Sequence, residues 1–310
     1  MTGPGFFFWL RLKMGILYIL LAALLFGSNP SVENILLSSG LTADLVAFAV
    51  VAVSGILAFF AGIIRKESFR LTSSQLAAVV LTGLIGRGLT EVCLIQAYTL
   101  VPPGVATMVH FFFPTVVCAA SILLFHEKLT WYKAAAVVLS VCGLYGIADG
   151  QTGGSITGVL FAGVTSLTFA FYYLMTERSS LKELPPMAMI FYVHLFGAVT
   201  CAAPLIAKGK SLAVIGGGQW LLLILSDSMC FVAFILLNRG IPVVGGGTAA
   251  FINMLEPVTS LMLSVVLFKS RLSVMTAAGC FLIVGALFVS VLETYSNTES
   301  APKAVEMRKK

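Results

Sequence analysis

The sequence contains very little charge. Lys, Arg, Asp and Glu make up only 10% of its 310 residues, whereas a soluble globular protein carries roughly a quarter. It also contains no P-loop, no HExxH and no GxSxG at a strand-to-helix turn, which are motifs of nucleotide-binding and hydrolytic enzymes. The sequence therefore gives no support to an enzyme, and ATP-driven transport would need a separate ATPase subunit.

The cysteines also lack a pattern that implies chemistry. All six lie inside apolar runs, and none has metal-ligand spacing. We therefore interpret them as small packing residues, and predict no metal and no cofactor. These cysteines are Cys93, Cys118, Cys142, Cys201, Cys230 and Cys280.

Long apolar runs dominate the chain, which is 59% hydrophobic and has a mean hydropathy of +1.02. Each run has about 20 residues, enough for a helix to cross roughly 30 Å of hydrocarbon. We predict an all-α integral membrane protein with ten transmembrane helices. The first run resembles a signal peptide, but no cleavage site follows it cleanly, and it is retained as a span. The predicted spans are 12–36, 42–64, 74–100, 103–125, 131–148, 156–177, 186–207, 218–238, 245–268 and 273–293.

The distribution of Lys and Arg predicts the orientation. With the N-terminus in the cytoplasm, the outer segments hold only Lys208, Lys210, Lys269 and Arg271. Almost all the other basic residues fall in inner segments, as the positive-inside rule requires. Both termini are therefore predicted to be cytoplasmic, in a bacterial inner membrane. The net charge of +6 is a topology signal, and no nucleic-acid partner is predicted.

The chain is an internal duplication. A shift of 143 positions aligns it with itself without gaps, and shared Pro and Gly at one register carry more weight than shared Leu or Ala. We predict a first five-helix repeat over 1–150, a second over 151–293, and a disordered cytoplasmic tail over 294–310. Matching pairs include Gly15 and Gly158, Phe26 and Phe169, Gly104 and Gly247, and Pro114 and Pro257.

Each repeat holds five spans. Because five is odd, the second repeat enters the membrane from the opposite side, so the repeats are inverted. Inverted repeats are a recurrent transporter architecture, with the substrate held near the midplane between the halves.

Two stretches carry a family resemblance. FPTVVCAASILLFHEKLTWYKAAAVVLSVCGLYGIA, in the first half, resembles the end of an EamA repeat, with an acidic loop residue at Glu127. LEPVTSLMLSVVLFKSRLSVMTAAGCFLIVGALFVS resembles its second copy, although Ser270 stands where Glu127 predicts an acid. Nearly the whole chain resembles the EamA-type members of the drug/metabolite transporter superfamily. That resemblance implies two inverted five-helix halves, small-molecule transport and export as the direction.

Few strongly polar side chains lie deep in the predicted spans. Because such groups face a bundle interior or a water-filled cavity, they are the candidate site. They are Asn29, Arg87, Glu91, His110, His194, Asp227, Asn253 and Glu256.

Arg87 and Glu91 are four residues apart and can meet on one helix face. They either form a self-neutralising pair that packs two helices, or line a central cavity in which Arg87 holds a substrate carboxylate. Gly83, Gly86 and Gly88 around Arg87 either bring a neighbouring backbone close or open room for a ligand.

The carboxylates of Glu91, Asp227 and Glu256 outnumber Arg87. The interior would be negatively charged if all of them were ionised, so it is expected to hold a proton or a cation. Glu91 and Glu256 are the proton-coupling candidates. Asp227 is interpreted either as part of the cavity or as a solvated group nearer the outer surface.

Pro114 and Pro257 are equivalent in the two halves. A proline inside a helix leaves the carbonyl four residues earlier without its donor, and here those carbonyls belong to His110 and Asn253. We predict hinges at the two prolines and interpret His110 and Asn253 as either cavity-lining groups or parts of simple kinks. His194, which has no polar counterpart, is interpreted as a hydrogen-bonded structural histidine.

These features predict a secondary transporter that moves small polar, amine-containing metabolites, such as amino acids, by alternating access. Arg87 would hold a carboxylate, Glu91 and Glu256 an amine or a proton, and His110 and Asn253 would orient the ligand, with Asn29 and Asp227 in the wall. The alternatives are an organic-cation transporter of the same fold and a non-transporting receptor or scaffold. Expected partners are a small-molecule substrate and membrane lipid, and the oligomeric state stays open between a monomer and a homodimer.

Overall fold

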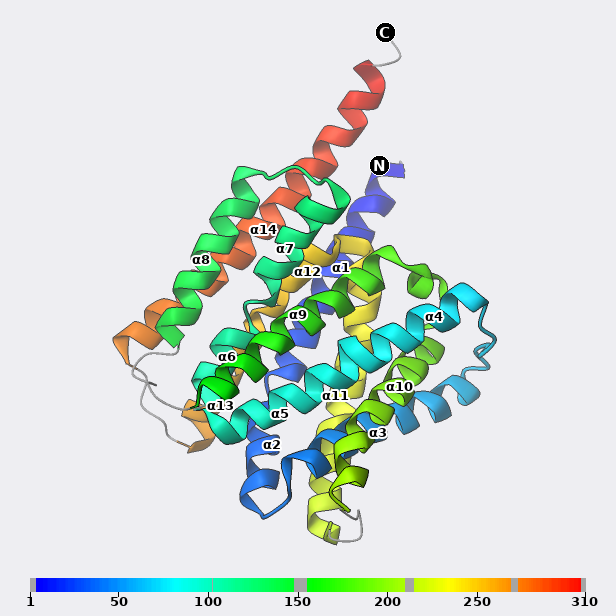
Figure 1. Ribbon diagram of the computed structural model, residues 1–310. Helices are drawn as coiled ribbons and strands as arrows, with labels where there is room; N and C mark the ends of the chain where they lie inside the picture. The colour runs from blue at the N-terminus through cyan, green and yellow to red at the C-terminus, as the bar shows by residue number, and fades with distance from the viewer. Residues whose placement is uncertain (1–3, 102, 148–154, 210–214, 269–272, 308–310) are drawn as a thin grey trace.

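The structure of the chain is a computed structural model that describes residues 4–101, 103–147, 155–209, 215–268 and 273–307. These residues form helices and connecting segments, and no strand occurs among them (Figure 1). Within them, eight helical spans are long and apolar enough to cross a membrane. The prediction of a multi-pass, all-α membrane protein is therefore confirmed.

Most boundaries fall within a few residues of the predicted spans. The first half contains α1 (Pro4–Phe26), α2 (Asn29–Ser38), α3 (Ala43–Ile64), α4 (Ser73–Leu81), the π-helix η1 (Thr82–Leu89), α5 (Thr90–Leu100), α6 (Pro103–His110), α7 (Phe113–Phe125) and α8 (Trp131–Ile147). The second contains α9 (Ile156–Arg178), the short 3₁₀ helix η2 (Ser180–Glu183), α10 (Pro186–Ala207), α11 (Gly217–Val244), α12 (Gly246–Asn253), α13 (Leu255–Phe268) and α14 (Val274–Met307).

Two of the ten predicted spans are not among these eight apolar helical spans. The helix α8 has 17 residues, and the predicted span 245–268 is divided into α12, with 8 residues, and α13, with 14. A count of ten crossings therefore stays a prediction. The expected disordered tail from residue 294 also differs from the structure, where α14 continues to Met307.

The two halves pack as a two-fold relation between them requires. The second spans of the halves, α3 and α10, pack against each other, and so do the fifth spans, α8 and α14. The first span of each half packs against the third span of the other, which pairs α1 with α11 and α5 with α9. The N-terminal end of α1 and the C-terminal end of α14 lie on the same side of the bundle (Figure 1), which agrees with an even number of crossings.

Both fourth spans are broken just before their proline. The segment 111–112 separates α6 from α7, and Met254 separates α12 from α13. Pro114 and Pro257 therefore lie in the first turn of a new helix, where proline is well tolerated, and not in mid-helix as the sequence suggested. The carbonyl oxygen of His110 that Pro114 leaves free lies 3.1 Å from the Ser166 hydroxyl of α9, which it shares with the carbonyl oxygen of Val109.

The π-helix η1 packs closely against α10 and α9. A Cβ atom on Gly88 would lie 2.6 Å from the Gly197 carbonyl oxygen, and one on Gly83 would lie 2.7 Å from the Val193 carbonyl oxygen. Of the two interpretations of these glycines, close backbone approach is therefore the one that the structure supports. This π-helix includes Arg87, and short π-helical segments are common at functional sites.

Replacing Gly88 tests this close packing. We expect Gly88→Ala to lower the free energy of unfolding by about 1–3 kcal/mol, because a backbone carbonyl cannot move aside as a flexible side chain can. Gly163→Ala is the matched control, since a Cβ there meets nothing within 4 Å. Thermal unfolding of both variants in detergent measures the difference, and equal melting temperatures would contradict the packing.

Candidate functional site

A cavity of about 230 Å³ lies between the two halves. Apart from Ile147 of α8, its walls come from the first, third and fourth spans of each half. Its size is below the roughly 300–1,000 Å³ of sites for drug-sized ligands. The lining residues are Phe26, Asn29, Pro30, Ser31, Glu33, Arg87, Thr90, Glu91, Leu94, Tyr98, Thr107, His110, Phe111, Ile147, Phe169, Cys230, Phe234, Glu256, Pro257, Ser260 and Leu261.

Equivalent positions of the two repeats line the cavity with different chemistry. At the offset of 143, three pairs of lining residues correspond: Phe26 with Phe169, Arg87 with Cys230, and Glu91 with Phe234. The first half thus supplies an ion pair where the second supplies a thiol and a ring. A symmetric fold therefore encloses an asymmetric site.

Arg87 is held from three directions. Its Nη1 forms an ion pair with Glu91, and its Nε donates a 3.2 Å hydrogen bond to Nε2 of His194. The guanidinium also lies over the ring of Phe234, with 5.1 Å between Cζ and the ring centroid, a favourable cation–π contact. A guanidinium has five N–H donors, so Arg87 retains donors for a solute carboxylate.

His194 orients Arg87 through a fixed tautomer. Its Nδ1 lies 2.9 Å from the Ile190 carbonyl oxygen and therefore carries the proton, which leaves Nε2 as the acceptor for Arg87. The predicted hydrogen-bonded histidine is thus present, and it acts on the site by positioning the guanidinium.

His110 lies in the cavity wall and is bonded across the halves. Its Nδ1 is 2.8 Å from the Thr165 hydroxyl, which itself donates to the Ala162 carbonyl oxygen. The hydroxyl proton is therefore already used, so His110 Nδ1 is the donor and Nε2 keeps its lone pair. A neutral imidazole in the wall can accept a hydrogen bond from a solute.

Glu256 faces the cavity, but Asn253 does not, contrary to the expectation for Asn253. Asn253 is fully buried, and its amide donates a 3.0 Å hydrogen bond to Glu256 Oε2. Asn253 therefore positions the Glu256 carboxylate from outside the cavity wall, across the helix break at Met254.

Glu33 is a cavity residue that the sequence reasoning missed. It lies in α2, is only 6% exposed and lines the cavity with Arg87 and Glu91. It was overlooked because it falls at the end of the first predicted span. Its position four residues after Asn29, which places both on one helix face, was the signal that could have found it.

Asn29 lines the cavity, whereas Asp227 is not among the lining residues. Asn29 Oδ1 accepts a 2.7 Å hydrogen bond from Ser226 of α11. The neighbouring Asp227 has no exposed surface, so neither interpretation of it, cavity lining or solvation near the outer surface, describes its position.

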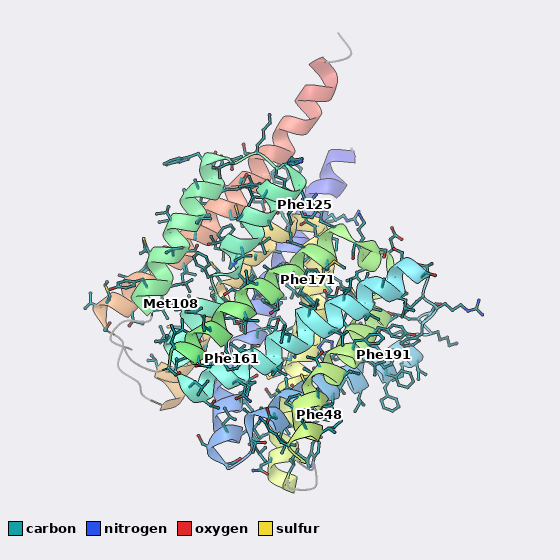
Figure 2. The ribbon with its side chains drawn as sticks, in the orientation of Figure 1. Phe48, Met108, Phe125, Phe161, Phe171 and Phe191 are labelled. Carbon is teal, nitrogen blue, oxygen red and sulfur yellow. The ribbon has the colours of Figure 1, made fainter. Side chains whose placement is uncertain are left out.

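An ion cluster joins the halves at the end of the bundle where the termini lie. The carboxylate of Glu127, in the connection from α7 to α8, pairs with Arg178 of α9 and with Lys133, whose Nζ is 2.8 Å away. Arg178 also lies over the ring of Phe125, which Figure 2 shows at this end of the bundle, with Phe48 toward the other. Burial raises the pKa of the Glu127 carboxyl, but Lys133 and Arg178 together lower it below its ordinary value.

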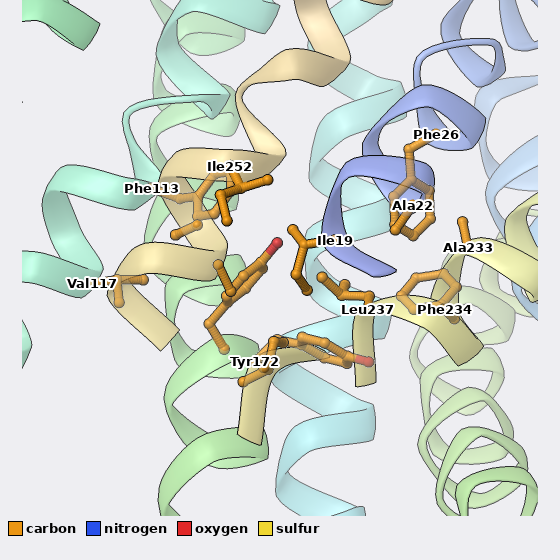
Figure 3. Packing of buried hydrophobic residues seen from close by; sticks show 14 of the residues in the cluster. Ile19, Ala22, Phe26, Phe113, Val117, Tyr172, Ala233, Phe234, Leu237 and Ile252 are labelled. Carbon is orange, nitrogen blue, oxygen red and sulfur yellow. The ribbon is translucent and has the colours of Figure 1, made fainter. Parts of the chain in front are cut away.

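A packed layer separates this ion cluster from the cavity. Phe113 and Tyr173 are fully buried, with 5.2 Å between their ring centroids. Figure 3 shows Phe113, Ile252, Tyr172 and Ile19 converging from four helices. In contrast, the cavity residues Asn29 of α2, Thr107 of α6 and Ser260 of α13 are partly exposed, and Figure 1 shows these helices away from the termini. The cavity is therefore closed toward the terminal side.

The fold and cavity define a class, multi-pass helical membrane proteins with a polar chamber between two repeats. The family model of the EamA-like transporter family matches residues 13–148 and 156–292. The chain therefore belongs to this family of drug/metabolite membrane transporters, as the resemblance implied, and the two matches begin 143 residues apart.

A solved structure titled only "Crystal structure of protein" superimposes with a TM-score of 0.75 at 21% identity, over 92% of this chain and 98% of the other. It shows a shared fold. No match was found among curated proteins.

The ion cluster gives a pH prediction. Because its folded-state pKa is lowered, Glu127 stabilises the fold above the ordinary carboxyl pKa, and the contribution is lost as the pH falls through the lowered value. We expect Glu127→Gln to reduce stability at pH 7 by about 1 kcal/mol or less, since the pair is partly exposed. Thermal unfolding should show this deficit shrinking in acid. The exposed Glu183→Gln is the control, and an unchanged deficit in acid would contradict the assignment.

Proposed function

We propose that the protein is a secondary transporter of small, polar, amine-bearing metabolites, with amino-acid-like compounds as the main class. The observation that carries the proposal is the composition of the cavity wall, in which three carboxylates face one arginine. Transport itself follows from the family, whereas the substrate class rests on this wall.

The charges of the wall favour an amine. Arg87 contributes one positive charge and Glu33, Glu91 and Glu256 three negative ones, so full ionisation leaves an excess of two negative charges. Uncompensated charge in a buried site is costly. Because Arg87 and Glu91 already pair, Glu33 and Glu256 are the groups that an ammonium group would neutralise, and His110 Nε2 offers it a further acceptor.

The remaining donors of Arg87 favour a zwitterion over a pure cation. Its guanidinium is held on Glu91 and His194 in the cavity wall, where it would bind a carboxylate while the amine lies nearer Glu33 or Glu256. An organic-cation transporter remains the second candidate, because the excess negative charge alone would suit it.

We propose alternating access as the mechanism, with the structure representing the state open away from the termini. The layer around Phe113 and Tyr173 and the pair of Glu127 with Arg178 would close the other side. Motion at the helix breaks before Pro114 and Pro257 would open that side in turn. The Lys and Arg distribution would place the closed side in the cytoplasm of a bacterial cell, with export as the direction and Glu91 and Glu256 as proton-coupling candidates.

Transport by glutamine variants tests the site. In liposomes screened with radiolabelled amino acids, aliphatic amines and nucleosides, we expect Glu33→Gln and Glu256→Gln each to lower amine flux about 10-fold or more, because each loses a charge-assisted bond. Glu183→Gln should retain wild-type flux. A wild-type protein that moves none of the compounds would favour a receptor or scaffold, and a nucleoside preference would overturn the amine assignment.

Arg87→Ala separates the two substrate classes. We expect it to abolish flux of L-alanine, which has a carboxylate, and to spare flux of choline, which has none. The double variant Arg87→Ala with Glu91→Ala controls for the unpaired Glu91 charge and should behave alike. Equal loss for both solutes in the double variant would show that Arg87 is not a carboxylate site.

A further inference from the structure

A second carboxylate site lies behind the cavity wall. Asp227 of α11 has no exposed surface, and neither of its carboxylate oxygens has a hydrogen-bond partner among the described residues. Its neighbour Ser226 donates a hydrogen bond to the cavity residue Asn29. Cys230, one turn later on α11, lines the cavity from the second half, whereas Arg87 lines it from the first. Asp227 is thus next to the solute cavity without being part of its wall.

The charged groups around Asp227 come from three elements. Glu33 of α2, Arg87 of η1 and Glu91 of α5 interact with it electrostatically. His194 of α10 is bonded to Arg87, and Cys230 is the titratable neighbour on α11 itself.

The other helices packed on α11 supply no partner for Asp227. Asp44, in the first turn of α3, is bonded to Lys208 and Gln96. On α9, the hydroxyl of Tyr172 donates to Asn238. The sequence of α12 has no titratable residue, and the charged residues of α1, Arg11 and Lys13, fall in its N-terminal part.

An ionised carboxylate in this position would be unstable. A charge buried without a hydrogen bond or counter-ion costs many kcal/mol, whereas a neutral acid costs far less. Among the described residues, the cation that interacts with Asp227 is Arg87, which is already held by Glu91. In the conformation described, Asp227 is therefore stable as the neutral acid.

Building on the proposed function, we propose that Asp227 is a proton-binding site, distinct from the solute cavity, that exchanges a proton for the solute ammonium group. When Asp227 releases its proton to water in the cavity, the carboxylate it leaves is paired by Arg87. Glu91, released from Arg87, then joins Glu33 and Glu256 in binding the solute ammonium. For a cationic solute one positive charge leaves the protein and one enters, so the buried charge is unchanged. A zwitterion also brings in its carboxylate, and in both cases one proton is exchanged for one solute molecule.

In this arrangement the proton and the amine do not bind the same carboxylate. They compete because Arg87 pairs with Glu91 when Asp227 is protonated and with Asp227 when the amine is bound. The equivalent position of the first half is Leu84, so an apolar side chain fits this place in the repeat. Asp227→Leu and Asp227→Asn are therefore both informative variants.

Infrared spectroscopy of the full-length protein in lipid vesicles tests the proton site without a solute. We expect the protonated-carboxyl C=O absorption at neutral pH to contain a component that is lost in both Asp227→Asn and Asp227→Leu and kept in Glu33→Gln and Glu256→Gln. The control Asp44→Asn, which removes a carboxylate paired with Lys208, should leave the absorption unchanged. An absorption that is the same in wild type and in both Asp227 variants would overturn the proposal.

Transport gives the second readout. With the membrane potential clamped at zero, a one-unit pH gradient should drive wild-type accumulation of L-alanine or choline to about 10-fold, since one pH unit corresponds to a tenfold ratio. The Asp227 variants should show no accumulation but should retain counterflow of the same solute. Accumulation equal to wild type in either variant would overturn the proposal. If wild type moves no solute, the proposed function fails, while the infrared band still decides whether Asp227 binds the proton.

Discussion

The absence of water inside a bilayer is the constraint on which this structure depends. A polar group there must be satisfied by protein or by a water-filled cavity, and Arg87 shows how this is met. Its ion-pair partner Glu91 lies one turn along the same span, and its hydrogen-bond acceptor His194 lies on the neighbouring α10. The glycines of η1 bring α10 close enough for this bond, so the packing of the third span and the chemistry of the site have the same cause.

Duplication provides the chamber, and divergence provides its chemistry. The two copies place equivalent residues around the cavity, but the first half supplies Arg87 and Glu91 where the second supplies Cys230 and Phe234. The same divergence affects the closed end. Glu127 pairs with Arg178, whereas the equivalent positions in the other copies are Ser270 and Ile35, which cannot form an ion pair. The ion pair between Glu127 and Arg178 is therefore a feature of one end of the bundle that the duplication does not repeat at the other.

The sequence predicts the spans well because hydrocarbon thickness and helix rise determine how long each apolar run must be. The sequence predicts less well which way a side chain points from its helix. Asn253 and Asp227 were assigned to the cavity from their depth, but their direction depends on the break at Met254 and on how α11 packs. Glu33 was missed because a charge near the end of a run resembles an interfacial residue, and the turn at Gly27 and Ser28 that brings α2 over the cavity is a tertiary feature. The π-helical geometry of η1 likewise depends on its contacts with α9 and α10.

The placement of the charges also bears on the speed of turnover. The ion pair between Arg87 and Glu91 lies within one span, so relative motion of the halves does not have to separate opposite charges in a medium of low permittivity. The bonds that join the halves near the cavity, from Thr90 to Thr168, His110 to Thr165 and Arg87 to His194, each have at least one neutral partner. Exchanging these weaker bonds sets a lower barrier to the relative motion of the halves than breaking an ion pair between them would. The transfer of Arg87 from Glu91 to Asp227 is a separate step, in which one ion pair replaces another.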